Sequence, residues 1–321
     1  MSRYQDVNAV KSIGIVGTGT IGASWAAYFL AQGFKVKAWD PANTWKVKLE
    51  NFIESAWTDL EKLGVPEIAT PSNLTFCDEL GSVTEGVDFI QENAPEQLGV
   101  KQKLFRELDK TAPTSVIISS STSGLIMSEM QENIENAERF VVGHPFNPPH
   151  LIPLVEVVGG ELTAAEVVEW TIDFYNSIGK HAIKINKEVP GHLANRLQAA
   201  LWREAVLAVQ NGLASVEDVN AAVAQGPGLR WALMGPHMIM NLAGGKGGLE
   251  QMLSHFAPGI QGWWQTMMET PNMDQKLQKV LVDGINKEAG NKTIDDLEKE
   301  RDTRLITVSY THLTLPTTPY V

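Results

Sequence analysis

Two residues in the middle of the chain have the chemistry and spacing of a base and its partner. His144 ends an apolar run, and Glu156 lies inside the next apolar run, at residues 154–158. A loop with four prolines joins the two runs and turns the chain rigidly. If both runs are strands that fold back near residue 150, the two side chains face each other. A carboxylate bound to one imidazole nitrogen fixes the tautomer and raises the basicity of the other nitrogen. We therefore predict His144 as a general base and Glu156 as the residue that orients it.

Simpler roles for the same residues stay open at this point. His144 could end a strand while Glu156 pairs with a surface lysine, although a lone carboxylate among Leu and Val is costly to bury. His150 is a second candidate for the base, but its place inside the proline loop predicts a surface position.

A glycine-rich turn near the start of the chain predicts a nucleotide site. The pattern Gly17-x-Gly19-x-x-Gly22 follows an apolar strand pattern and opens a helical one. The first glycine allows a tight turn, the second lets backbone N–H groups approach a pyrophosphate, and the third lets the helix pack closely on the sheet. The helix N-terminus then favours the anion. The loop residues predicted to bind the cofactor are Gly17, Thr18, Gly19, Thr20, Ile21 and Gly22.

Asp40 predicts which dinucleotide binds. It ends the second apolar run, 18 residues after Gly22, where a carboxylate accepts both ribose hydroxyls and repels a 2′-phosphate. We therefore predict NAD rather than NADP. For the glycine pattern taken alone, an ordinary turn without a ligand is the alternative.

These residues need a frame of alternating strands and helices to position them. The alternation predicts an α/β fold: an N-terminal Rossmann domain with a doubly wound, mostly parallel sheet, followed by a smaller all-α C-terminal domain. Strands are expected at residues 12–16, 34–39, 74–76, 89–91, 115–119, 140–143, 155–158 and 182–185. Helices are expected at residues 22–32, 44–63, 99–108, 164–178, 191–210 and 215–224, with Ser215 as an N-cap and with loops at 226–230 and 244–248.

The character of the sequence changes near residues 187–190, which predicts a domain boundary there. We expect an NAD-binding Rossmann domain at residues 1–188 and a helical domain for substrate binding and dimerisation at 189–308. The Thr- and Pro-rich tail at 309–321 differs from the acidic helix pattern before it. It is expected to be a non-native or disordered end.

Size, charge and cysteine content restrict the class of protein. The chain has 321 residues, enough for two domains, and its net charge of −12 argues against nucleic acid and anionic membranes as partners. No apolar run reaches the roughly 18 residues of a membrane span, and residues 1–10 lack the features of a secretion signal. Cys77 is the only cysteine, which predicts a reducing, cytoplasmic environment, and no metal site is predicted.

The order of these motifs resembles the L-3-hydroxyacyl-CoA dehydrogenase family over about residues 11–304. That family has a strand ending in Asn-Thr-Ser-Ser-Leu, the segments His-Phe-Phe-Asn-Pro and Leu-Val-Glu, and a helix that starts with Gly-Phe-x-x-Asn-Arg-Leu. The corresponding segments of this chain are Ser121-Thr-Ser-Gly-Leu125, His144-Pro-Phe-Asn-Pro148, Leu154-Val-Glu156 and Gly191-His-Leu-Ala-Asn-Arg-Leu197.

The resemblance implies a catalytic set of four residues. His144 would be the base and Glu156 its orienting partner, while Ser123 and Asn195 would hydrogen-bond the oxygen of the substrate. For Ser123 and Asn195 the alternative is that each only caps a helix.

The resemblance also implies further contacts with the cofactor. Glu96, Lys101 and Ser123 would contact the cofactor, and Asn147 would contact the nicotinamide or the substrate. For Lys101 a solvated surface position is the alternative.

Other segments resemble one branch of the family, which contains L-carnitine 3-dehydrogenases and the lambda-crystallins or L-gulonate 3-dehydrogenases. They are the Ser-Ser-Thr-Ser-Gly-Leu segment at 120–125, the His-Pro-Phe-Asn-Pro-Pro form at 144–149 and residues 228–236. Residues 200–205 and the Trp263-Trp264 pair are most similar to the carnitine enzymes. The resemblance implies an NAD-dependent dehydrogenase that oxidises the 3-hydroxyl of a small L-3-hydroxy acid, with L-carnitine as the first candidate. 3-Hydroxybutyryl-CoA, other 3-hydroxyacyl-CoA thioesters and L-gulonate are alternative substrates. A non-catalytic NAD-binding or structural protein is the alternative of another class.

Residues of the second domain could bind such a substrate. Aromatic faces attract a quaternary ammonium group, and Trp202, Trp231, Trp263 and Trp264 all lie there, although tryptophans are usually core or interface anchors. Arg230 could bind the substrate carboxylate from a buried loop or could hold loop carbonyls instead. The apolar helical domain is expected to bury surface against a second copy, giving a homodimer.

Overall fold

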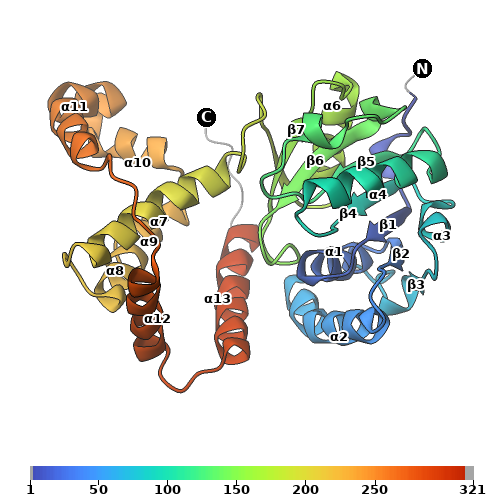
Figure 1. Ribbon diagram of the computed structural model, residues 1–321, viewed down its shortest axis with the longest axis horizontal. Helices are drawn as coiled ribbons and strands as arrows, with labels where there is room; N and C mark the ends of the chain where they lie inside the picture. Colours follow the sequence, from blue (N-terminus) through green and yellow to red (C-terminus); the bar gives the residue numbers. More distant parts are fainter. Residues whose placement is uncertain (1–2, 315–321) are drawn as a thin grey trace. The chain divides into compact units, whose positions relative to one another are not determined.

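The computed structural model describes residues 3–314, with side chains described to residue 308, and divides into two compact units (Figure 1). Residues 1–195 and 299–321 belong to the first, which we call the sheet unit, and residues 196–298 form the second, the helical unit. The residues 315–321 of the predicted tail lie outside the described residues, whereas the backbone of residues 309–314 continues the last helix. Among the described residues, no helix is long and apolar enough to span a bilayer.

Eight strands of the sheet unit form one sheet in the order β3-β2-β1-β4-β5-β6-β7-β8. All neighbouring pairs are parallel except β6 and β7, which are antiparallel. This is the mostly parallel, doubly wound sheet that the sequence predicted. The strands are β1 (Ser12–Val16), β2 (Lys35–Trp39), β3 (Leu74–Phe76), β4 (Phe89–Glu92), β5 (Ile117–Ser120), β6 (Phe140–Pro145), β7 (Leu154–Gly159) and β8 (His181–Lys184).

Helices cover both faces of this sheet, because the strands bury apolar side chains on each side. Ile13 and Val141 face a core shared with α1, α2 and α6, whereas Ile118 and Val142 face a core shared with α3, α4 and α5. The helices of this unit are α1 (Thr20–Ala31), α2 (Trp45–Leu63), α3 (Leu80–Thr84), α4 (Leu98–Thr111), α5 (Met127–Met130) and α6 (Ala165–Ser177), with short 3-10 turns at Val7–Ala9, Pro71–Asn73 and Ala137–Arg139.

The helical unit contains no strand among its described residues. Ser215 caps α8, as predicted, by accepting a hydrogen bond of 3.1 Å from the backbone N–H of Asp218. Its helices are α8 (Val216–Ala224), α9 (Pro227–Trp231), α10 (Pro236–Ala243), α11 (Gly248–Thr266) and α12 (Gln275–Ala289), with a 3-10 turn at Gly245–Gly247; α7 (Ala194–Gln210) and α13 (Ile294–Thr314) cross its limits.

The loops predicted at 226–230 and 244–248 were wrong in part. Residues Pro227–Trp231 form the short helix α9, because Pro227 stands at the start of the helix, where its fixed φ fits and its missing N–H is not needed. Gly245–Gly247 form a 3-10 turn.

The domain boundary expected at residues 187–190 stays a prediction. The start of α7 belongs to the sheet unit, whose first segment ends at Asn195. The reason is local: the backbone N–H groups of Leu193 and Ala194 donate to Glu156, and the Asn195 side chain donates to the carbonyl of Ser123.

Candidate active site

The antiparallel pairing of β6 and β7 places His144 directly opposite Glu156. The Nδ1 atom of His144 lies 2.8 Å from Oε2 of Glu156, and the two side chains are buried. Burial opposes the charge of Glu156, but hydrogen bonds from His144 and from the backbone of Ala194 and Leu193 hold the pKa of this carboxyl below its usual value. A charged carboxylate accepts, so Nδ1 carries the proton and Nε2 presents a lone pair.

The second oxygen of Glu156 has a role that the sequence did not suggest. Oε1 accepts hydrogen bonds of 3.0 Å from the N–H of Leu193 and 2.8 Å from that of Ala194, at the start of α7. A carboxylate at a helix N-terminus satisfies free N–H groups and interacts favourably with the helix dipole. The same carboxylate thus fixes both the imidazole and the first turn of α7.

The glycine loop after β1 has the shape that a diphosphate needs. Gly17 adopts a φ of +87°, and a Cβ at Gly22 would lie 1.9 Å from the carbonyl oxygen of Gly17, so the turn closes only with glycine at both positions. A Cβ at Gly19 would meet nothing within 4 Å, and Gly19 and Thr20 are exposed at the start of α1. Open space therefore faces backbone N–H groups at the N-terminus of α1.

Asp40 follows β2 and lies beside this loop. Its carboxylate accepts hydrogen bonds of 2.7 Å from the N–H of Thr18 and 2.9 Å from that of Ala42. The loop and Asp40 lie at the carboxyl ends of β1 and β2, and the chain order of the sheet reverses between β1 and β4. That reversal is where open α/β sheets bind dinucleotides, so these residues fit NAD.

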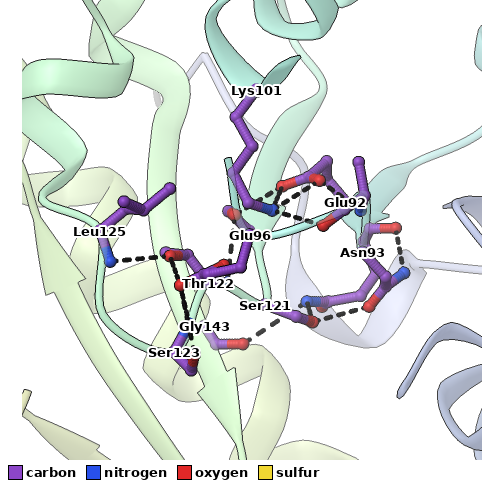
Figure 2. A network of polar contacts seen from close by, with 12 residues as sticks. Glu92, Asn93, Glu96, Lys101, Ser121, Thr122, Ser123, Leu125 and Gly143 are labelled. Carbon is purple, nitrogen blue, oxygen red and sulfur yellow. Dashed lines mark hydrogen bonds and ion pairs between the residues drawn. The ribbon is translucent and has the colours of Figure 1, made fainter. Parts of the chain in front are cut away.

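Glu96 organises the loop that carries Ser123 (Figure 2). Its Oε1 accepts from the N–H groups of Ser123 and Gly124, both at 2.9 Å, and from Oγ1 of Thr122 at 2.7 Å. The Ser123 hydroxyl lies 3.2 Å from the same oxygen. Burial raises the pKa of Glu96, but the bond from Thr122, the charge of Lys101 and the two N–H donors lower it further, so the pKa lies below its usual value.

Lys101 is buried, so the alternative of a solvated lysine was wrong (Figure 2). Its ammonium lies 2.8 and 2.9 Å from the two oxygens of Glu92 and 3.1 Å from the carbonyl oxygen of Ala94. The three N–H groups thus have three acceptors within the protein. Lys101 holds the turn after β4 from which Glu96 extends, and a direct contact with the cofactor stays a prediction.

These geometries agree with a match to known families. Residues 12–189 match the model described as "3-hydroxyacyl-CoA dehydrogenase, NAD binding domain", and residues 191–284 match its "C-terminal domain". This chain belongs to the 3-hydroxyacyl-CoA dehydrogenase family. It is accordingly an NAD-dependent dehydrogenase.

Several similar proteins carry the name L-carnitine dehydrogenase. The L-carnitine dehydrogenase of Streptomyces coelicolor is 47% identical over 93% of this chain and 94% of its own length. That of Streptomyces griseus is 48% identical over 93% of this chain and 89% of its own length. Among solved structures, the NAD⁺-dependent 5-formyl-3-hydroxy-2-methylpyridine 4-carboxylic acid 5-dehydrogenase is 29% identical to this chain. The two structures agree with a TM-score of 0.81 over 95% of this chain and 99% of that enzyme.

The other predicted site residues of this dehydrogenase lie in two places. In the sheet unit, the Asn195 side chain donates to the carbonyl of Ser123 at 2.9 Å, and Asn147 is exposed in the proline loop. Arg230 and Trp231 lie in the helical unit, on α9, and both are exposed. The expectation that Arg230 extends from a buried loop was therefore wrong.

His150 is buried, and the prediction of a surface position was wrong. Its Nδ1 lies 2.7 Å from Oγ of Ser24, and its backbone N–H donates to the same oxygen at 2.9 Å. Burial, the largest cause, lowers the pKa of His150 to about 4. The proline loop packs onto α1 and turns the imidazole inward, a contact between distant residues that local composition could not reveal.

Proposed function

We propose that this protein is an L-carnitine 3-dehydrogenase, which oxidises the 3-hydroxyl of L-carnitine to the ketone with NAD. The observation that carries the reaction is the pair of His144 and Glu156, because it leaves one imidazole nitrogen free to accept a proton. The identity of 47–48% with two named L-carnitine dehydrogenases supports the substrate.

Each residue of the pair has a defined task in this proposal. Nε2 of His144 takes the hydroxyl proton, and the charge of Glu156 stabilises the imidazolium that results. Ser123 and Asn195 orient the oxygen on C3 of the substrate. The hydrogen bond that the Asn195 side chain donates to the Ser123 carbonyl keeps the two residues adjacent. Bound NAD supplies the hydride acceptor.

The remaining predicted residues hold the two ligands. The loop of Gly17, Thr18, Gly19, Thr20, Ile21 and Gly22 binds the diphosphate, and Asp40 binds the ribose. Glu96, Lys101 and Ser123 contribute to cofactor binding, and Asn147 contacts the nicotinamide or the substrate. Arg230 binds the carboxylate of the substrate, with Trp231 beside it on α9.

The test is an NADH absorbance assay with L-carnitine, L-gulonate and 3-hydroxybutyryl-CoA. We expect the highest kcat/KM with L-carnitine, and a loss of about 10²–10⁴ in kcat for His144→Gln. His181→Gln, on β8, is the matched control and should keep the parental kcat. Preference for the thioester would reject the substrate, and an active His144→Gln variant would reject the base.

We also propose a cytoplasmic homodimer that associates through the helical unit. The exposed large apolar side chains support this, since Trp202, Trp263 and Trp264 are 59%, 67% and 65% exposed. Light scattering should give twice the chain mass, and Trp263→Gln with Trp264→Gln should shift the equilibrium towards monomer. Cys77, a lone buried thiol, supports the reducing location, which fractionation of cells would test.

A further inference from the structure

A second histidine lies next to the catalytic pair. The ring of His192 is 5.3 Å from the ring of His144, centroid to centroid, and His192 is only 2% exposed. The family motif Gly-Phe-x-x-Asn-Arg-Leu has phenylalanine where this chain has His192. Its backbone adopts a φ of +49°, in the left-handed region that residues other than glycine seldom occupy and in which histidine is among the better tolerated.

The hydrogen bonds of His192 define its tautomer. Nε2 lies 3.1 Å from the carbonyl oxygen of Thr122, and because a carbonyl only accepts, Nε2 carries the proton. Nδ1 is buried and finds no hydrogen-bond partner among the residues that the structure describes. In this tautomer Nδ1 is a bare acceptor, and the ring is uncharged.

The surroundings of His192 favour the uncharged ring. Burial, the largest cause, and repulsion from a positive charge on His144 lower the pKa of His192 more strongly than the bond to Thr122 and the carboxylates of Glu156 and Glu96 raise it, so this pKa lies below the usual value. A neutral neighbour leaves the proton that arrives at His144 unopposed by a second positive charge.

His192 belongs to a segment that joins both halves of the site. Its side chain binds the carbonyl of Thr122, and the side chain of Asn195 binds the next carbonyl, that of Ser123. Between them, the N–H groups of Leu193 and Ala194 bind Glu156. Two successive carbonyls of the serine loop and the orienting carboxylate are thus held by four consecutive residues.

We propose that His192 is a positioning residue, which holds the Ser123 loop against the pair of His144 and Glu156. The inference rests on the proposed dehydrogenase reaction and acts within it: His192 does not touch the reacting atoms, and its effect on the rate runs through Ser123. The Nε2–H group of His192 carries this effect, because Nε2 is the ring atom within hydrogen-bond distance of the Thr122 carbonyl.

Three variants separate this hydrogen bond from packing. In His192→Gln the amide reaches as far as Nε2 and can still donate to Thr122, whereas in His192→Asn it reaches only as far as Nδ1. His192→Phe keeps a ring without the donor. We expect His192→Gln to stay within about threefold of the parental kcat, and the other two variants to lose about tenfold, the size of one hydrogen bond.

A double-variant cycle with Ser123→Ala tests the route of the effect. If His192 acts through Ser123, then His192→Asn should cause no further loss of kcat once Ser123 is alanine. An additive loss, or equal losses for the Gln and Asn variants, would overturn the inference. The acid limb of the pH profile should be the same in the parent and in His192→Gln, and its disappearance would make His192 a base rather than a positioning residue.

Two measurements need no substrate and so distinguish failure of this inference from failure of the proposed reaction. Nitrogen chemical shifts of the His192 ring should show the uncharged Nε2–H tautomer at pH 7. The ring should stay uncharged until the pH falls below about 6.5, the ordinary pKa of histidine. Amide exchange at Ser123 and Gly124 should be faster in His192→Asn than in His192→Gln. An Nδ1–H or charged ring at pH 7, or equal exchange in the two variants, would refute the assignment even if L-carnitine proves not to be the substrate.

Discussion

Replacing Glu156 with glutamine tests most directly whether Glu156 fixes the tautomer of His144, because the substitution exchanges one heavy atom and removes one charge. Glu156 accepts from His144 through Oε2 and from Leu193 and Ala194 through Oε1. An amide offers one acceptor and one donor in the same space. If its oxygen keeps the bonds to Leu193 and Ala194, its NH2 group must face Nδ1 of His144.

This arrangement reverses the tautomer of His144. Nδ1 then has to accept, so the proton of the neutral ring moves to Nε2, the atom that would take the hydroxyl proton. If the amide turns the other way, its NH2 group faces two N–H donors at the start of α7. General base catalysis contributes about 10²–10⁴ in rate, so kcat should fall by that factor, about 3–5 kcal/mol of activation free energy.

The assay is NADH formation at saturating NAD, with KM for NAD measured in parallel. KM for NAD should stay near the parental value, because Glu156 lies on β7, away from the glycine loop after β1. Glu188→Gln is the matched control, since Glu188 accepts hydrogen bonds from the N–H and the hydroxyl of Ser128 rather than from a histidine. A kcat of Glu156→Gln within tenfold of the parent, or an equal loss in the control, would refute the tautomer argument.

Three further predictions concern the cofactor, the buried ion pair and the buried histidine. Asp40→Asn should narrow the preference for NAD over NADP by about tenfold, the size of one charged hydrogen bond, and an unchanged ratio of the two kcat/KM values would count against the ribose contact. Lys101→Met leaves the buried Glu92 without its cation, which should lower the free energy of unfolding in urea by about 3–5 kcal/mol, whereas Lys46→Met, in an exposed pair with Asp78, should change it little. Because His150 is neutral when folded, with a pKa of about 4, and protonates more readily when unfolded, stability should fall as the pH drops from 6.5 towards 4. His150→Asn should flatten that slope, and an unchanged slope would place the titration elsewhere.

The parts of the site that the sequence predicted are those set by neighbours in the chain. Strand alternation and a short proline loop bring residues 144 and 156 into register, because antiparallel strands joined by one turn can pair in few ways. The glycine turn was recognisable for the same reason, since its three spacings lie within one strand–turn–helix unit.

The parts that it missed depend on contacts between distant segments. The buried His150 is hydrogen-bonded to Ser24, 126 positions away, and the capping of α7 by Glu156 spans 37 and 38 positions. The pair of Lys101 and Glu92 is closer in sequence, yet a lysine next to helical residues has the composition of an exposed one. In each case the polar side chain is buried because its hydrogen-bond partner is buried as well. Neither residue alone predicts that burial.

The bond from Glu156 to the first turn of α7 has a consequence for exchanging modules between members of this family. A hybrid joined before residue 191 would take the first turn of α7 from another protein. The N–H groups that bind Glu156 would then be foreign, and Glu156 is the residue that fixes the tautomer of His144. A splice after Asn195, paired with a second one before residue 299, transfers the helical unit alone and leaves Glu156 with its own donors. The junction expected to preserve activity therefore lies inside helix α7 and not in the linker before it.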